Sequence, residues 1–117
     1  MSKRVLVVDD SNLLRNAISR CLTSAGHEVV GKGQNGDEAV LLYEKLRPDA
    51  VTLDVTMRGK DGIAAAEEIL RLDPKAFIIF YTLLDIPDLA AKTCSIGVRD
   101  IIRKGDEEEL LRVLGAA

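Results

Sequence analysis

The sequence predicts an α/β protein with three layers, in which helices cover both faces of one doubly wound, five-stranded parallel sheet. Short apolar runs alternate with segments of helical spacing five times along the 117 residues. The apolar runs are nearly continuous, as in strands that are buried on both faces. Five strand–helix units use almost the whole length, so we expect a single domain over residues 1–117.

The first strand–helix unit opens with the apolar run Arg4–Val8. Apolar residues at helical spacing follow over residues 14–25, and Gly26 is typical of a residue at which a helix stops. A second, weaker strand begins at Val29. After it, Asn35-Gly36 predicts a turn.

Prolines mark the ends of the next two helices. An amphipathic helix over residues 39–46 ends before Pro48, because proline disfavours a helical conformation in the residue that precedes it. Ala50–Leu53 is the third strand, and residues 63–70 form a helix that Asp73-Pro74 closes.

The last two units complete the alternation. The fourth strand is Phe77–Tyr81, and a helix over Asp85–Ile96 accepts Pro87 because proline is tolerated in the first turn of a helix. Residues 101–102 form a short fifth strand. Glu107–Leu114 is the last helix, with acidic residues at its start, where the helix dipole favours them.

Charged and polar side chains stand directly after the predicted strands. In open parallel sheets, ligands bind outside the carboxyl ends of the strands. All but the second strand contribute such residues, namely Asp9, Asp10, Asp54, Thr82 and Lys104. We expect these side chains to meet at one edge of the sheet.

Three carboxylates at one edge repel one another, and Lys104 balances only one of them. A divalent cation would balance the rest, and a small set of oxygen ligands is typical of Mg²⁺ rather than zinc. A carboxylate beside such an ion can attack phosphorus and form an aspartyl phosphate. We expect Asp54, at the tip of a buried strand, to be that nucleophile, with Lys104 and the Thr82 hydroxyl stabilising the phosphoryl group.

Each of these residues also has a simpler interpretation. Asp9 and Asp10 suit the cap of the following helix, and Asp54 suits an exposed loop. Lys104 suits a solvated surface, and Thr82, which is β-branched, suits its strand. These interpretations do not explain why all five residues fall at one sheet edge, so we favour the metal and phosphoryl site.

Composition excludes several other classes of protein. The chain is 47% hydrophobic and 30% charged, as globular proteins are, and its net charge of −3 without a basic patch argues against nucleic-acid binding by this domain alone. Its apolar runs are too short to span a membrane, and its N-terminus lacks a secretory pattern, so we expect a cytoplasmic protein without membrane contact. Cys21 and Cys94 form no metal or disulfide motif, and we expect both to be buried.

Four segments carry a resemblance to a known family: VLVVDDS, VTLDVTMRGKDG, IIFYT and IIRK. In order and spacing they resemble the receiver domain of bacterial two-component response regulators, of the chemotaxis-regulator type. The resemblance implies a flavodoxin-like (βα)5 fold with strand order 2-1-3-4-5. It also implies a domain that accepts a phosphoryl group from a histidine kinase or phosphotransfer protein, and that is not a turnover enzyme.

The resemblance implies a role for each residue of the edge. Asp54 would be the phosphoacceptor, and Thr82 and Lys104 would contact the phosphoryl group. Mg²⁺ would be held by Asp9, Asp10, Asp54 and the backbone carbonyl of Thr56. Output would come from a shift of residues 85–114 toward an output protein or domain that the sequence does not identify, and phosphorylation-dependent dimerisation is a further expectation.

Four positions depart from the usual pattern of the family. Arg58 stands in place of a proline, and we expect an effect on loop order or kinase docking. Gly105 stands where proline usually follows the lysine, so we expect a trans peptide bond there. Ile101 replaces the aromatic residue that is usually coupled to the threonine. Leu83 replaces a small residue, and we expect slow labelling of Asp54 by acetyl phosphate.

Two other functions fit parts of the pattern. A Mg²⁺-dependent phosphohydrolase of the haloacid dehalogenase type also uses an aspartyl nucleophile, but it typically carries a second carboxylate two residues later, where this chain has Thr56. Steady turnover of a phosphate ester would identify such an enzyme. A receiver-like binding module that is never phosphorylated is the other alternative.

Overall fold

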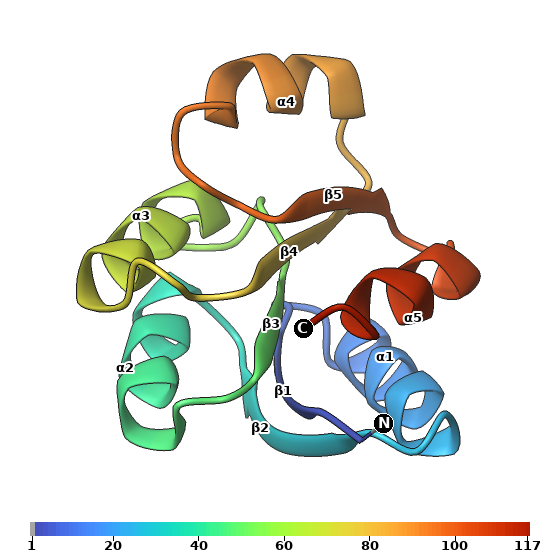
Figure 1. Cartoon of the computed structure of the whole chain (residues 1–117). Coiled ribbons are helices and arrows are strands. Elements are labelled where there is room, and N and C mark those ends of the chain that lie inside the picture. Colours follow the sequence, from blue (N-terminus) through green and yellow to red (C-terminus); the bar gives the residue numbers. More distant parts are fainter. Residues whose placement is uncertain (1) are drawn as a thin grey trace.

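The computed structural model describes residues 2–117, which form one parallel sheet with helices on both faces (Figure 1). The strands are β1 (Arg4–Val8), β2 (Glu28–Gly33), β3 (Ala50–Leu53), β4 (Ile78–Thr82) and β5 (Asp100–Arg103), in the order β2-β1-β3-β4-β5. The helices are α1 (Asn12–Ser24), α2 (Gly36–Leu46), α3 (Gly62–Leu72), α4 (Ile86–Thr93) and α5 (Glu107–Leu114). Within residues 2–117, no helix has the length and apolar character needed to cross a membrane. The predicted flavodoxin-like fold and its strand order are confirmed.

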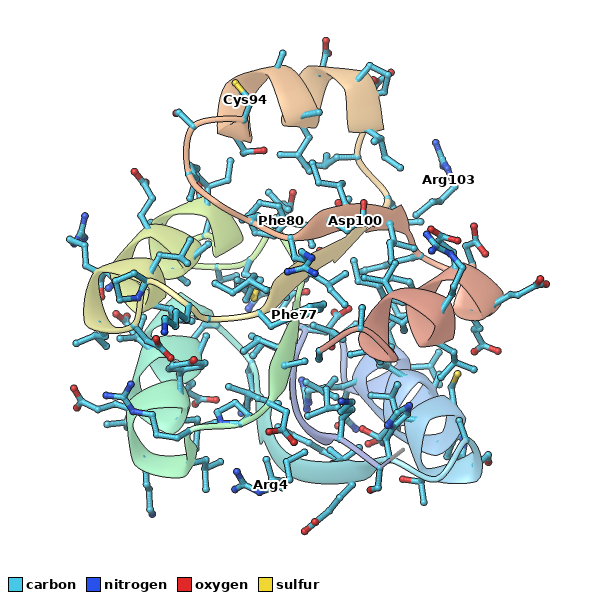
Figure 2. The ribbon with its side chains drawn as sticks, in the orientation of Figure 1. Arg4, Phe77, Phe80, Cys94, Asp100 and Arg103 are labelled. Atoms are coloured by element: carbon cyan, nitrogen blue, oxygen red, sulfur yellow. The ribbon has the colours of Figure 1, made fainter. Side chains whose placement is uncertain are left out.

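Two hydrophobic cores, one on each face of the sheet, hold the layers together. On the face covered by α1 and α5, Leu22 and Leu110 pack with Val5 of β1. On the face covered by α2, α3 and α4, Phe80 of β4 lies in the interior (Figure 2). Every residue of β3 and β4 is buried, because these strands are covered on both faces.

The pairing of the strands brings the polar residues of the predicted site together. β1 and β3 end level with each other, so Asp9 and Asp54 follow them at adjacent positions. β4 and β5 also end level, with Thr82 opposite Arg103, so Lys104 follows directly and its backbone N–H bonds to the Thr82 carbonyl. The carboxyl edge of the sheet therefore collects these residues, as the alternation of strands and helices predicts.

Three elements differ from their predicted form. Asn35-Gly36 is not a turn between strand and helix, because the Asn35 side chain caps α2 and accepts a hydrogen bond from the Glu38 N–H at 2.9 Å. β4 lies one residue later than predicted and includes Thr82. α4 ends at Thr93 instead of Ile96, and the chain then turns with Gly97 at a φ of 104°.

α4 packs more lightly than its apolar pattern predicts. It lies over the β5 edge of the sheet, and only Leu89 and Thr93 of its residues are buried (Figure 1). Ala90, an apolar residue of this helix, is exposed. Cys94, at the end of the helix (Figure 2), is exposed, and Cys21 is half-buried, so the prediction that both cysteines are buried is wrong.

Candidate functional site

The three predicted carboxylates lie together at the carboxyl end of the sheet. One oxygen from each of Asp9, Asp10 and Asp54 lies within 4.8 Å of the other two. Asp9 and Asp54 are only 1% and 6% exposed, whereas Asp10 is exposed. The cluster therefore has a buried base and one exposed carboxylate at its outer side.

The start of α1 holds Asp9 in place. Ser11 caps this helix through its side chain, which accepts a hydrogen bond from the Leu14 N–H at 3.2 Å. The backbone N–H of Ser11 donates to Asp9 Oδ1 at 2.9 Å, and the Arg15 guanidinium donates to the Asp9 backbone carbonyl at 2.7 Å. One carboxylate oxygen of Asp9 is thus fixed by the helix, and the other remains for the cluster.

Asp54 is held by backbone contacts on either side. Its N–H donates to the Val8 carbonyl at 2.9 Å, and its Oδ1 accepts the Val55 N–H at 2.9 Å. Gly62, at the start of α3, lies directly against this segment, since a Cβ at residue 62 would be 2.1 Å from the Asp54 carbonyl oxygen. Only glycine fits there, so α3 begins in direct contact with the backbone of Asp54.

Lys104 connects β5 to the buried carboxylates. Its backbone N–H donates to the Thr82 carbonyl at 2.9 Å. Its ammonium nitrogen lies 2.8 Å from Asp9 Oδ2 and 3.2 Å from Asp54 Oδ2, and its side chain is 9% exposed. One positive charge therefore faces a cluster of three carboxylates.

Burial and charge together set the protonation of this pair. Burial raises the pKa of Asp54 above its ordinary value, the Lys104 ammonium opposes that rise, and the charge of Asp9 adds to it. Burial also acts to lower the pKa of Lys104, but its contacts with Asp9 and Asp54 outweigh burial and raise that pKa. Lys104 therefore stays charged at neutral pH, and the poorly solvated Asp54 carboxylate is favoured by any added cation.

Thr82 lies at the same edge, with its side chain turned to its own loop. The residue is 1% exposed, and its Oγ1 accepts the Leu84 N–H at 3.0 Å. Across residues 2–117, the Thr82 hydroxyl makes no hydrogen bond to any of the three carboxylates. A hydroxyl that only accepts a hydrogen bond still has its hydrogen to donate.

The cluster fits a divalent cation. Asp9 Oδ2 is buried and, apart from its ion pair with Lys104, has no hydrogen-bond donor in the described part of the chain. Asp9 shares this one ammonium with Asp54, so the buried negative charge is only partly balanced, and a bound divalent cation would supply the remaining positive charge. The candidate ligands are all carboxylate oxygens, which suits hard cations such as Mg²⁺. Thr56, the predicted carbonyl ligand, lies in the exposed loop two residues after Asp54.

Two positively charged side chains in and next to the site were not predicted from the sequence. Arg15 contacts the Asp9 backbone from the first turn of α1, and its position four residues after Ser11 is the only local signal for that contact. Lys60 forms ion pairs with Asp37 of α2 and Glu68 of α3, and it thereby ties the loop after β3 to two helices. Its partners lie far enough along the chain that no short motif predicts them.

The four unusual positions have different surroundings. The Lys104–Gly105 peptide bond is trans, as predicted, and Gly105 has a φ of 97° with its N–H donating to the Tyr81 hydroxyl at 2.8 Å. Leu83 is 64% exposed, so its side chain lies largely in solvent next to the buried Thr82. The remaining two positions are Ile101, half-buried on β5, and Arg58, exposed in the loop after β3.

Comparison with known proteins agrees with this geometry. The model of the response regulator receiver domain family matches residues 5–114. The chemotaxis protein CheY of Thermotoga maritima is 41% identical over 104 residues, which is 89% of this chain and 87% of that protein. Protein CcdB of Bacillus subtilis is 42% identical over 105 residues, covering 90% of this chain and 88% of that protein.

Solved structures give the same result. A LuxR-family two-component response regulator from Aurantimonas sp. SI85-9A1 superposes with a TM-score of 0.93 at 30% identity, over 99% of this chain and 84% of that one. The CheX–CheY–BeF3–Mg²⁺ complex from Borrelia burgdorferi gives a TM-score of 0.90 at 30% identity, over 97% and 87% of the two chains. The chain therefore belongs to the response regulator receiver domain family, the phosphoacceptor domains of two-component signalling.

Proposed function

We propose that Asp54 is the phosphoacceptor of this domain, and that a histidine kinase or phosphotransfer protein supplies the phosphoryl group. The observation that carries this proposal is that Asp54 combines an ion pair with Lys104 and slightly greater exposure than Asp9. Its Oδ2 lies 3.2 Å from the Lys104 ammonium, while Asp9 is more deeply buried and Asp10 makes no ion pair within residues 2–117. A nucleophile beside a fixed cation can receive a phosphoryl group whose charge is already opposed.

The transfer step follows from the contacts of these side chains. An Asp54 carboxylate oxygen forms a bond to phosphorus as the bond from phosphorus to the donor nitrogen breaks, and the electron pair leaves with the donor imidazole. Lys104, now 2.8 Å from Asp9 and 3.2 Å from Asp54, pairs with a phosphoryl oxygen instead. The Thr82 hydroxyl, which has its hydrogen available, donates to another.

Mg²⁺ is the cofactor we propose for this site, held by Asp9, Asp10, Asp54 and the Thr56 backbone carbonyl. When bound, it supplies two positive charges beside the phosphoryl oxygens. The three carboxylates are negatively charged and are opposed by a single lysine, so two further positive charges would balance the site. The neighbour from Borrelia burgdorferi contains BeF3 and Mg²⁺ together with CheX and CheY, and we propose that this chain binds the same two ligands.

Output is proposed to pass through α4, β5 and α5. α4 is anchored by only Leu89 and Thr93, and it follows directly on the loop after β4, in which the Leu84 N–H donates to the Thr82 hydroxyl. When the Thr82 hydroxyl turns to the phosphoryl group, its bond to the Leu84 N–H is lost and the start of α4 is released. A lightly packed helix can then move at low cost and present a new surface to an output protein, an output domain or a second copy of the chain.

Beryllofluoride with Mg²⁺, a mimic of an aspartyl phosphate, tests this proposal by two-dimensional ¹H–¹⁵N NMR. We expect the amide signals of Val55, Thr82 and Leu84 to shift in the wild-type protein, followed by signals of α4 and β5. Asp54→Asn removes the nucleophile and should abolish these shifts. Glu44→Gln, which removes an exposed acid on α2, is the matched control and should respond as the wild type does.

Labelling with radioactive phosphate from a phosphorylated kinase tests the transfer itself. The label should appear on the wild-type and Glu44→Gln proteins and not on the Asp54→Asn protein. If Asp54→Asn accepts label as fast as the wild type, another residue is the acceptor.

A further inference from the structure

A polar cavity of about 310 Å³ adjoins the carboxylate cluster and is not used by the proposed transfer step. Asp10, Gln34, Asn35 and Arg58 line it. These residues come from the loops that follow β1, β2 and β3, so the cavity opens at the carboxyl edge of the sheet. Asp10 belongs to both the cavity and the cluster, which makes the two sites continuous.

The cavity is rich in hydrogen-bond donors that have no partner. Within residues 2–117, the Arg58 guanidinium makes no ion pair and no hydrogen bond, and neither does the side-chain amide of Gln34. The Asn35 carbonyl oxygen accepts the Glu38 N–H at 2.9 Å, which leaves its NH₂ group to donate elsewhere. A guanidinium and two amides together suit a carboxylate, which accepts hydrogen bonds from arginine in a bidentate manner.

The position of the cavity matches the path of a leaving group. In an in-line transfer, the leaving oxygen stands opposite the attacking oxygen across phosphorus. Asp54 is buried, as Asp9 is, and Asp10 is the exposed member of the cluster, so the side of phosphorus away from Asp54 faces outward. The cavity beside Asp10 lies on this outer side.

We propose that Arg58, with the amides of Gln34 and Asn35, forms a subsite for the carboxylate that leaves an acyl phosphate. This inference rests on the proposed role of Asp54 as phosphoacceptor. The Asp54 carboxylate forms a bond to phosphorus, the bond between phosphorus and the acyl oxygen breaks, and that oxygen departs with the electron pair as a carboxylate. No proton is transferred, and Arg58 opposes the negative charge that develops on the leaving group.

Asp10 is the one anion of the lining, and it would repel the departing carboxylate. It also belongs to the proposed metal site, so its charge is opposed whenever the cation is bound. The remaining lining groups carry one positive charge and no negative charge. The cavity is therefore selective for an anionic leaving group in the metal-loaded domain.

A comparison of two phosphodonors isolates the leaving group. Acetyl phosphate releases a carboxylate, whereas phosphoramidate releases neutral ammonia and offers Arg58 nothing to bind. The readout is the ratio of the labelling rate of Asp54 with acetyl phosphate to that with phosphoramidate, both with Mg²⁺. We expect Arg58→Gln to lower this ratio about tenfold, the size expected for loss of one charge-assisted interaction in the transition state.

Arg71→Gln is the matched control, because Arg71 is exposed in the last turn of α3, at the end of that helix away from the site. Its ratio should equal that of the wild type. Arg58→Lys keeps the charge but not the bidentate geometry, and its ratio should lie between those of the wild type and Arg58→Gln.

An unchanged ratio in Arg58→Gln would overturn the subsite, and so would an equal loss of rate with both donors, since that would show an effect on the loop or on the phosphoryl group. Failure of the wild-type protein to accept label from either donor or from a kinase would instead overturn the proposed function, and the subsite with it. The two inferences thus fail by different results.

Discussion

Lys104 faces two buried carboxylates and can neutralise only one of them at a time. Its distances of 2.8 Å to Asp9 and 3.2 Å to Asp54 describe a lysine that is shared between the two acids. Residue types and spacing predict that Lys104 and the acids share one edge. They do not predict that Asp9 is the nearer partner, because that depends on the register between β1, β4 and β5 and on the side-chain conformation.

Tyr43 offers a residue-scale test of electrostatics away from the site. It is 2% exposed, and its hydroxyl donates to Asp73 Oδ2 at 2.7 Å. This hydrogen bond is the main cause that lowers the pKa of Asp73. A lowered pKa means that the bond stabilises the fold fully above the ordinary aspartate pKa of about 4 and that this contribution is lost as the pH falls through the lowered value.

We therefore expect Tyr43→Phe to lower the free energy of unfolding by about 1 kcal/mol at pH 7, and by less at pH 3, when measured by urea denaturation. Tyr81→Phe is the control, because the Tyr81 hydroxyl accepts a hydrogen bond from the Gly105 backbone and involves no carboxylate. Its cost should not change between the two pH values. Equal pH dependence in both variants would contradict the assignment of the effect to Asp73.

At the scale of elements, capping and helix ends are where sequence patterns mislead. Asn35-Gly36 is a common turn dipeptide, yet here Asn35 is the N-cap of α2. A side-chain carbonyl oxygen can accept a hydrogen bond from the unpaired backbone N–H three residues later, and this bond caps the helix. The spacing of apolar residues predicts a helix as far as Ile96, but it does not predict the residue at which α4 ends. Because that helix lies over an edge, few of its apolar residues find a partner.

Lys60 ties one loop to two helices, and its loss tests whether this tie supports the metal site. Its ammonium forms ion pairs with Asp37 at 3.2 Å and with Glu68, and its carbonyl accepts the Gly36 N–H at 3.0 Å. The same loop carries Thr56, the proposed carbonyl ligand. We expect Lys60→Met to weaken Mg²⁺ binding about two- to fivefold, measured by isothermal titration calorimetry.

Lys45→Met, which removes an exposed lysine from the last turn of α2, is the control for this change of charge. Its affinity for Mg²⁺ should equal that of the wild type. If both variants lose affinity equally, the loss comes from net charge and not from the position of the loop.

At the scale of the whole molecule, the alternation of strands and helices predicts almost everything that positions the site. The fold brings Asp9, Asp10, Asp54 and Lys104 together because β1, β3 and β5 are parallel and end at one edge. The contacts that hold these residues, such as that of Arg15, depend on side-chain packing in three dimensions. Sequence periodicity carries no information about such contacts.

The thermal stability of the entire domain shows how strongly the repulsion among the three carboxylates destabilises the fold. Without metal, Asp54→Asn removes one of three mutually repelling carboxylates, so we expect its midpoint of thermal unfolding to exceed that of the wild type by several degrees. Mg²⁺ at 100 times its Kd should stabilise the wild-type domain by about 2.7 kcal/mol. Asp54→Asn, with fewer ligands, should gain less, and differential scanning calorimetry with and without a chelator measures both effects.

A wild-type domain that is already more stable than Asp54→Asn in the presence of chelator would contradict this account of the cluster. So would an equal gain from Mg²⁺ in the two proteins.

The close contact of Gly62 with the Asp54 backbone also limits which substitutions evolution can accept in this domain. Gly62 lies three residues from Gly59, whose φ of 73° is unfavourable for most side chains but whose surroundings are open. Asparagine or aspartate adopts that backbone conformation at modest cost, so position 59 is free to drift. Position 62 has no such latitude, because any added carbon displaces the carbonyl of Asp54 itself. Related sequences should therefore vary at position 59, whereas selection should keep glycine at position 62.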